Sequence, residues 1–137
     1  MALISSKGAY GLRAMYELSL APTNSLTQIK TIAQNSGISQ NYLEQLLSIL
    51  RRSNLVESIR GAQGGYRLSR PAKDIMVFEI IEALEGDIEI VSQTTQADPL
   101  KLFYKECHEA LKKALKVSLA ELRPYHERLL GQLNYSI

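Results

Sequence analysis

Hydrophobic and polar residues are spaced most regularly between residues 38 and 52, where the spacing predicts an amphipathic helix. Its apolar side consists of leucines three and four residues apart: Leu43, Leu46, Leu47 and Leu50. Its other side is polar: Gln40, Asn41, Glu44, Gln45 and Ser48. This pattern is typical of a helix that buries one face and leaves the other free. Ser39 suits the N-cap of this helix, and Ile38 can pack on Leu43 as a hydrophobic staple.

Two more helices are expected before this segment. The first begins at Ser5 or Ser6 and extends to about Leu20, where an Ala-Pro-Thr-Asn sequence interrupts it. The second opens at residues 25–28, Ser-Leu-Thr-Gln, a capping box in which the serine and glutamine side chains would satisfy free amides. Gly37 suits the left-handed residue that ends the second helix. Because the next helix starts a few residues later, the pair predicts a helix-turn-helix.

A β-hairpin is expected after the helix-turn-helix. Residues 55–60 alternate between apolar and polar side chains, and residues 66–69 form a second short run that Pro71 ends. Between them lies the sequence Gly-Ala-Gln-Gly-Gly, whose glycines favour a tight turn. Together with the helices, this hairpin predicts a winged helix-turn-helix.

The second half of the chain predicts a long helix that needs a partner. Residues 75–84 are typical of a short strand-like start and a buried helix, and residues 86–97 of a polar loop. Asp98 and Pro99 favour the start of a helix that extends to about Lys116. One side of that helix is apolar: Leu100, Phe103, Cys107, Ala110, Leu111 and Ala114. Since the core of the small domain is mostly complete before this helix, we expect this side to be the interface of a homodimer.

A second capping box, from Ser118 to Glu121, predicts a short helix that stops before Pro124. The expected fold class is therefore mostly α with a small β-hairpin, namely a winged helix-turn-helix with a long C-terminal dimerisation helix. We place the winged helix-turn-helix domain at residues 1–85. Residues 86–137 then hold the loop, the dimerisation helix and a C-terminal tail.

Charge is unevenly distributed along the chain. Residues 1–70 carry eight Lys and Arg against three acidic residues, a net charge of +5, whereas residues 71–137 carry eight against eleven, a net charge of −3. A basic head on an acidic remainder indicates a head that binds a polyanion. No apolar run approaches the roughly 18 residues that a membrane span needs. The first seven residues hold no apolar core of signal-peptide length, so we expect a cytoplasmic protein without a membrane partner.

The third helix and the hairpin together indicate DNA binding. An α-helix fits the major groove, where Asn and Gln pair with adenine and Glu accepts from cytosine. The candidates for base contacts are Gln40, Asn41, Glu44 and Gln45. The candidates for phosphate contacts are Ser39, Tyr42 and Arg51 or Arg52. In the hairpin turn, Arg60 can enter a narrow minor groove, beside Gly61 and Gln63. The alternative is a solvated helix face and an ordinary hairpin.

Other chemistry finds little support in the sequence. Cys107 is the single cysteine and His108 follows it, but neighbours on a helix point about 100° apart and do not form a dyad. One cysteine and two histidines are too few for an intrachain structural zinc site. The glycines of the hairpin lack the lysine of a P-loop. We therefore expect neither an enzyme nor a cofactor. Cys107 is interpreted as a buried structural residue, with a thiol switch at the dimer interface as the alternative.

Two segments carry a resemblance to a known family. Residues 38–47 read Ile-Ser-Gln-Asn-Tyr-Leu-Glu-Gln-Leu-Leu, and residues 58–68 read Ser-Ile-Arg-Gly-Ala-Gln-Gly-Gly-Tyr-Arg-Leu. Together they resemble the Rrf-type winged-helix transcriptional regulators of bacteria, and the resemblance extends over essentially the whole chain. It implies a homodimeric regulator, a repressor at a palindromic operator in double-stranded DNA, whose long C-terminal helix crosses to the other subunit.

The resemblance also bears on the signal. Cluster-binding members of this family carry three cysteines in the loop before the dimer helix, whereas residues 86–97 hold none. The chain is more similar to a cluster-free branch that represses cysteine metabolism and ends, as Tyr135 and Ile137 do here, in an aromatic residue near an isoleucine. For that branch the resemblance implies a complex with cysteine synthase, in which these two residues are the candidate contacts. For the C-terminal residues, the alternative is a frayed terminus without a partner. For the protein as a whole, the alternative is a winged helix that serves only as a protein-interaction module.

Overall fold

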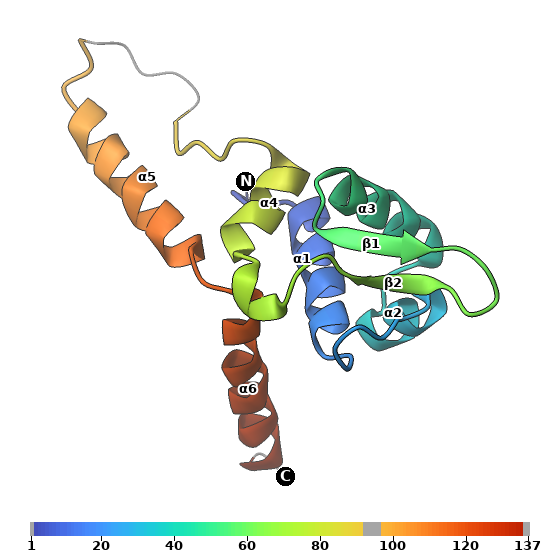
Figure 1. Ribbon diagram of the computed structural model, residues 1–137. Helices are drawn as coiled ribbons and strands as arrows, with labels where there is room; N and C mark the ends of the chain where they lie inside the picture. Colours follow the sequence, from blue (N-terminus) through green and yellow to red (C-terminus); the bar gives the residue numbers. More distant parts are fainter. Residues whose placement is uncertain (1, 92–96, 136–137) are drawn as a thin grey trace.

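The computed structural model describes residues 2–91 and 97–135, the side chain of Tyr135 excepted. Its elements, in chain order, are α1 (Ser6–Ser19), α2 (Ile29–Ser36), α3 (Gln40–Arg52), β1 (Val56–Ile59), β2 (Gly65–Leu68), η1 (Ala72–Asp74), α4 (Val77–Glu85), α5 (Lys101–Leu115), η2 (Leu119–Leu122) and α6 (Arg123–Tyr135). Helices α1 to α4 form a compact head, the hairpin projects from one side of it, and α5 extends from the other (Figure 1). The predicted fold class, a winged helix-turn-helix with a long C-terminal helix, is confirmed.

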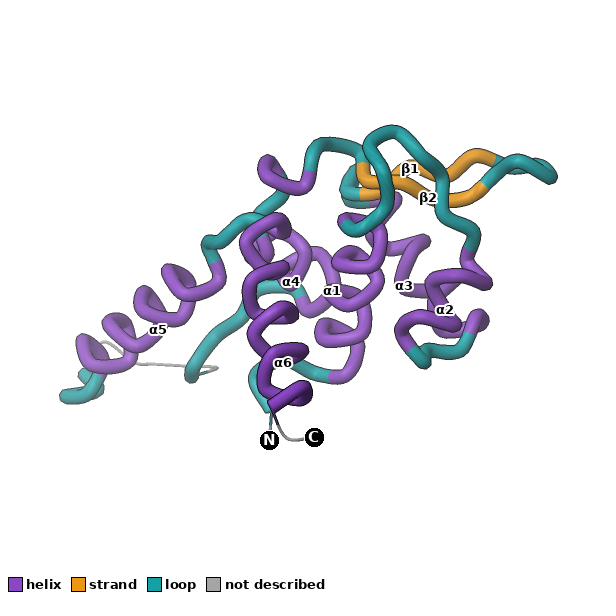
Figure 2. The backbone as a smooth tube through the Cα atoms, turned by 90° about the horizontal axis from the view of Figure 1, so that it is seen from below, coloured by secondary structure: helices purple, strands orange, loops and turns teal. Residues whose placement is uncertain are grey.

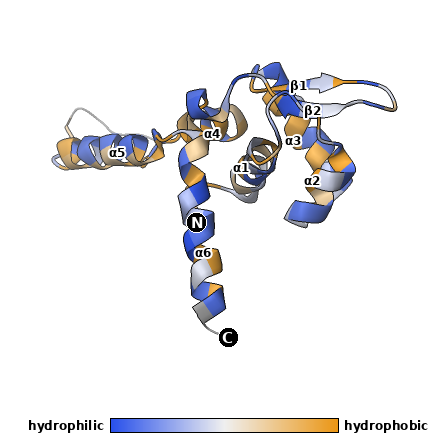
Figure 3. Cartoon of the chain, turned by 60° about the horizontal axis from the view of Figure 1, so that its bottom comes forward, coloured by the Kyte–Doolittle hydropathy of each residue, from blue (hydrophilic) through white to orange (hydrophobic). Residues whose placement is uncertain are grey.

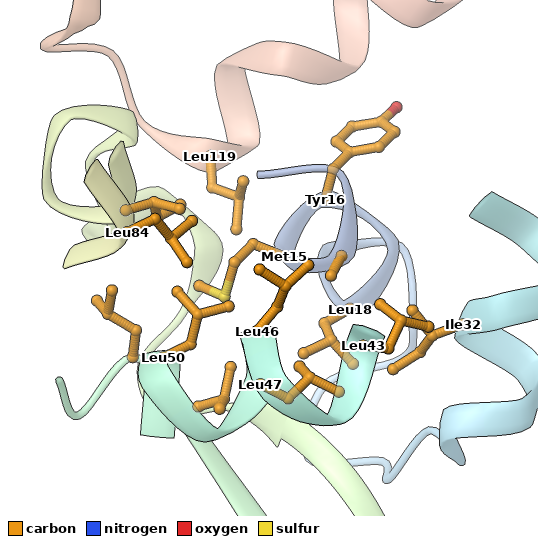
Figure 4. Packing of buried hydrophobic residues seen from close by; sticks show 14 of the residues in the cluster. Met15, Tyr16, Leu18, Ile32, Leu43, Leu46, Leu47, Leu50, Leu84 and Leu119 are labelled. Carbon is orange, nitrogen blue, oxygen red and sulfur yellow. The ribbon is translucent and has the colours of Figure 1, made fainter. Parts of the chain in front are cut away.

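The core of the head lies between α1, α3 and α4. Met15 of α1 is fully buried and is surrounded by the leucines of α3 and by Leu84 of α4 (Figure 4). All four leucines of the predicted apolar face of α3 are buried in this cluster. Leu119 of η2 joins it from the far end of the chain, so the C-terminal half is anchored in the same core.

Helices α1 and α4 approach each other closely because α1 presents glycines to α4. A Cβ atom on Gly11 would lie 2.1 Å from Cδ1 of Leu84, and one on Gly8 would lie 2.4 Å from Oε1 of Glu85. The space that the glycines leave lets the Glu85 carboxylate reach the first turn of α1. Its Oε1 accepts hydrogen bonds from the backbone N–H of Ser5 at 2.9 Å, from the Ser5 hydroxyl at 2.6 Å and from the N–H of Gly8 at 2.9 Å. A carboxylate at this position satisfies amides that have no partner within the helix and complements the helix dipole.

Replacing Glu85 with glutamine should flatten the acid dependence of stability. The hydrogen bond from the Ser5 hydroxyl lowers the pKa of the Glu85 carboxyl. Burial raises this pKa, but the N–H groups of Ser5 and Gly8 and the charge of Lys7 lower it further, and the net shift is downward. A lowered pKa in the folded state gives stability that is present above the ordinary carboxyl pKa of about 4.3 and is lost as the pH falls through the folded value. Urea unfolding from pH 7 to pH 3 measures this. We expect Glu85→Gln to cost about 1 kcal/mol at pH 7 and less as the pH falls. Glu82→Gln, which changes an exposed carboxylate on the same helix, is the control. If Glu85→Gln lowers the free energy of unfolding equally at pH 7 and at pH 3, the role assigned to the Glu85 carboxylate is contradicted.

The start of α2 differs from the prediction. The expected capping box at residues 25–28 is wrong, because α2 begins at Ile29 and its N-cap residue, Gln28, makes no side-chain cap hydrogen bond. The Ser25 hydroxyl instead donates to the carbonyl of Pro22, in the turn after α1. Thr27 is engaged in a β-bridge to Tyr66 and is extended, so the helix cannot start until after it. Gly37 ends α2 in the left-handed region, at φ 74°, as predicted.

The C-terminal helices also differ from the prediction. The capping box at Ser118 and Glu121 is confirmed, but the helix that it opens does not stop before Pro124. The 3-10 helix η2 continues into α6, and Pro124 is the second residue of α6, within the first turn, where a proline is tolerated. Helix α5 begins at Lys101, later than predicted, and Asp98 accepts a hydrogen bond from the N–H of Leu100 in the turn before it.

The long helix α5 makes few contacts with the rest of the chain. None of its described residues is buried, and orange hydrophobic segments lie along both α5 and α6, which extend away from the head (Figure 3). After α5 the chain returns to the head, where the N–H of Val77 donates to the carbonyl of Val117 and the N–H of Leu119 to that of Ile75, both at 2.8 Å. Within residues 2–91 and 97–135, no helix is long and apolar enough to cross a membrane.

Candidate DNA interface

Helix α3 presents the polar face that the sequence predicts. The Ser39 side chain caps it by accepting from the N–H of Tyr42, and the leucines fix its rotation by packing inward. The four candidates for base contacts are all exposed on the opposite side: Gln40, Asn41, Glu44 and Gln45. They occupy the first two turns, the part of a recognition helix that reaches base edges.

Tyr42 differs from its neighbours because its ring is half-buried. The ring meets that of Tyr10 edge to face, with 5.9 Å between the ring centroids, and it also packs against the hydrophobic core. This contact holds the amino end of α3 against α1. The sequence predicted Tyr42 as a phosphate contact and gave no sign of its pairing with Tyr10, because the two residues are 32 positions apart.

The hairpin is a two-stranded antiparallel wing. Its register pairs Val56 with Leu68 and Ile59 with Gly65, and the side chain of Glu57 forms a 2.8 Å ion pair with Arg67 across the strands. The turn carries the predicted wing residues, all exposed: Arg60, Gly61 and Gln63. In both views the turn lies on the side of the head that bears α2 and α3, away from α5 (Figures 1 and 2).

The basic residues of this side fall into two groups. Arg67 is paired with Glu57, and Arg70 donates to both oxygens of Glu79 at 2.8 and 2.9 Å. Burial alone would raise the pKa of Glu79, but the N–H of Met76 and the Arg70 guanidinium outweigh it and lower that pKa. Arg60, in contrast, forms no ion pair within the described part of the chain. Its charge therefore remains available to an external anion.

Arg51 links the recognition helix to the wing. Its Nη1 donates to the Ser58 hydroxyl of β1 at 3.3 Å, while Arg51 as a whole remains exposed. Sequence reasoning selected Arg51 as a phosphate contact, and the structure adds that it bridges α3 and β1. The structure thus brings together the predicted residues of α3 and of the wing on one side of the head.

The predicted dimer residues lie on α5 and, for Leu100, at its N-cap, apart from the candidate DNA interface. Leu100, Phe103, Ala110 and Ala114 are exposed, and Cys107 and Leu111 are half-buried. Cys107 is thus more accessible in the single chain than the sequence interpretation assumed. Among the described residues, no three His, Cys, Asp or Glu side chains come together in a way that could hold a metal ion.

Sequence reasoning missed a contact between the head and α6. The Tyr16 hydroxyl, which points out of the core cluster (Figure 4), lies 2.8 Å from Nδ1 of His126, and the two rings meet edge to face. Burial raises the pKa of the Tyr16 phenol, although the charge of Arg123 opposes it. Ile137 and the side chain of Tyr135, the candidate contacts for cysteine synthase, lie outside the described residues.

Comparison with known families identifies the class of protein. A model of the Rrf2 family, described as an iron-dependent transcriptional regulator, matches residues 4–133. The chain belongs to the Rrf2 family. Iron–sulfur clusters are held by cysteine thiolates, as many as four for each cluster. With Cys107 as its single cysteine, the chain does not fit such a site.

Individual relatives extend the comparison over most of the chain. The HTH-type transcriptional regulator CymR of Bacillus subtilis is 41% identical over 124 residues, which are 89% of this chain and 90% of CymR. The regulator IscR of Cereibacter sphaeroides is 46% identical over 87 residues, but the aligned part is only 56% of IscR. The solved structure of CymR, the global cysteine regulator of B. subtilis, superposes with a TM-score of 0.81 at 41% identity, and the match covers 91% of this chain and 98% of CymR. The structure of T. potens IscR superposes with a TM-score of 0.77 at 35% identity and covers 92% of this chain and 89% of IscR. This Rrf2 protein is therefore a DNA-binding transcriptional regulator.

Proposed function

We propose that this Rrf2 protein is a homodimeric repressor of cysteine or sulfur metabolism that binds a palindromic operator and responds to cysteine synthase. One observation carries the proposal. The exposed polar residues of α3 and Arg60, which forms no ion pair with the residues that the structure describes, lie on one side of a chain that is 41% identical in sequence to CymR. In the proposed complex α3 lies in the major groove, and Arg60 enters the adjacent minor groove, where the negative potential of a narrow groove attracts arginine.

The role proposed for each residue follows from the chemistry of its side chain. Gln40, Asn41, Glu44 and Gln45 offer the donors and acceptors that distinguish base pairs in the major groove. Ser39, Arg51 and Tyr42 are the proposed phosphate contacts, which would position the protein without reading the sequence. Dimerisation through α5 would present two such surfaces to the two halves of a palindrome. The exposed apolar residues of α5 support this part of the proposal, because a helix of this kind needs an apolar partner.

Binding of the protein to its own promoter DNA across a salt series tests the proposal, and each measurement is made with and without cysteine synthase. Fluorescence anisotropy is expected to give an affinity that falls by about a hundredfold or more between 50 and 200 mM salt, because bound phosphates release counterions. Arg60→Ala should lower the affinity by about tenfold. Arg128→Ala, which removes the same charge from the exposed part of α6, is the control and should have little effect.

The outcomes separate the parts of the proposal. Tighter binding with cysteine synthase supports the cysteine branch, and deletion of residues 135–137 should then abolish the increase. Tight binding that ignores the synthase keeps the DNA-binding regulator and removes the synthase as its signal. A shallow salt dependence with no preference for the promoter would contradict the operator itself and favour a protein-interaction module.

A further inference from the structure

The wing is joined to the segment before α2 by a pair of backbone hydrogen bonds. The N–H of Thr27 donates to the carbonyl of Tyr66 at 2.8 Å, and the N–H of Tyr66 donates back to the carbonyl of Thr27 at 2.8 Å. This reciprocal pair is an antiparallel bridge between Thr27 and β2. Thr27 therefore acts as a one-residue third strand on the edge of β2 that does not pair with β1.

Gly65 makes the bridge possible because any side chain there would collide with Thr27. A Cβ atom on Gly65 would lie 2.7 Å from the carbonyl oxygen of Thr27 and 2.9 Å from its carbonyl carbon, which are backbone atoms that cannot turn away. Its φ of +154° is also a conformation that residues with a side chain rarely adopt. An alanine at this position would therefore force β2 and Thr27 apart.

The bridge connects the two parts of the proposed DNA interface. Thr27 stands two residues before α2, and α2 leads through Gly37 to the cap of α3. On the other strand, the Ser58 hydroxyl accepts from Arg51 of α3. The wing is thus held to the helix-turn-helix along both of its strands, once by a backbone pair and once by a side chain. A two-stranded hairpin alone is only marginally stable in water, so these links help to fix its position, together with the packing of Val56, Tyr66 and Leu68 against the core.

We propose that the Thr27–Tyr66 bridge, which Gly65 permits, is a positioning element that sets Arg60 at the distance from α3 needed to occupy both DNA grooves at once. The inference rests on the proposed DNA contacts of Arg60. Holding the turn in place before binding removes the cost of ordering it in the complex, so the arginine contributes its full contact energy. Without the bridge, β2 loses its link to the segment before α2, the turn is held less firmly relative to α3, and the arginine loses most of its contribution.

A double-mutant cycle between Gly65→Ala and Arg60→Ala tests this. Each single variant is expected to lower operator affinity by about tenfold. The double variant should bind no more weakly than Gly65→Ala alone, because Arg60 cannot act once the wing is displaced, and coupled residues are not additive. A second cycle between Gly65→Ala and Gln45→Ala on α3 is the matched control, and its effects should add. Additive effects in the first cycle would overturn the inference.

Two further measurements keep the test independent of folding and of the proposed function. Hydrogen exchange should show that the amide of Tyr66 loses protection in Gly65→Ala while the amides of α3 keep theirs. If Gly65→Ala fails to fold, Thr27→Pro, which removes one N–H of the bridge, should reproduce the cycle. Thr27→Val, which keeps both backbone bonds, should bind like the wild type.

If wild-type protein shows no preference for the operator, the proposed function fails. If it binds and Arg60→Ala weakens binding equally in every background, the positioning role alone fails.

Discussion

Replacing Phe103 with aspartate is expected to convert the proposed homodimer to a monomer and to lower operator affinity by about a hundredfold. Phe103 lies on α5 with 60% of its surface exposed in the single chain, on the apolar side proposed to meet a second copy. A carboxylate in that interface would lose its hydration without gaining a partner. A monomer then binds one half-site at a time and loses the gain of two linked contacts, which is worth about 100- to 10,000-fold. Analytical ultracentrifugation gives the mass, and anisotropy gives the affinity.

Leu102→Asp is the matched control for this experiment. Leu102 is more exposed, at 74%, and is next to Phe103 on the same helix, but it lies outside the predicted apolar side. Consecutive side chains on a helix point about 100° apart, so the control introduces the same charge toward a different direction. If Leu102→Asp dissociates the proposed dimer and Phe103→Asp does not, the predicted dimer face is wrong.

The second large effect is expected at the junction between the C-terminal half and the head. Leu119→Ala should lower the free energy of unfolding by about 3 kcal/mol, in the range for leucine truncations that leave a cavity. Leu119 is fully buried and lies close to Leu84 and Met15 in the cluster (Figure 4). Because its N–H also bonds to Ile75, the loss should spread to the attachment of η2 and α6.

Urea unfolding followed by circular dichroism, at one fixed protein concentration, measures this loss. Leu3→Ala makes the same truncation at a residue that is 54% exposed, and it should change stability by about 0.5 kcal/mol or less. Hydrogen exchange in α6 should rise in Leu119→Ala and stay unchanged in Leu3→Ala. Equal stability of the two variants would show that Leu119 does not anchor the C-terminal half.

The sequence predicted elements whose signals are local. The leucine spacing of α3, the serine that caps it and Gly37 after α2 each act within a few residues, so their roles could be identified from the pattern alone. Predictions failed where a distant partner competes with a local signal. The capping box at residues 25–28 loses to the backbone pairing of Thr27 with Tyr66, which no local pattern reveals.

The predicted site shows the same limit. The exposed polar residues of α3 and the wing could be named from the sequence, because amphipathic spacing separates the outer face of a helix from its inner face. The contact between Tyr16 and His126 could not, since the two residues are 110 positions apart and neither is part of a recognisable motif. Pro124 misled the prediction because a proline both ends helices and suits their first turn.

The Glu85 carboxylate on the first turn of α1 has a consequence for how the head folds. It joins the beginning of one helix to the end of another across 80 residues of chain. In a nascent or unfolded chain, α1 therefore lacks its cap until α4 has docked, and α4 lacks the glycine-lined surface that receives Leu84 until α1 is helical. Each helix completes the other, so the head should form in one cooperative step late in synthesis, after the wing has emerged, rather than helix by helix.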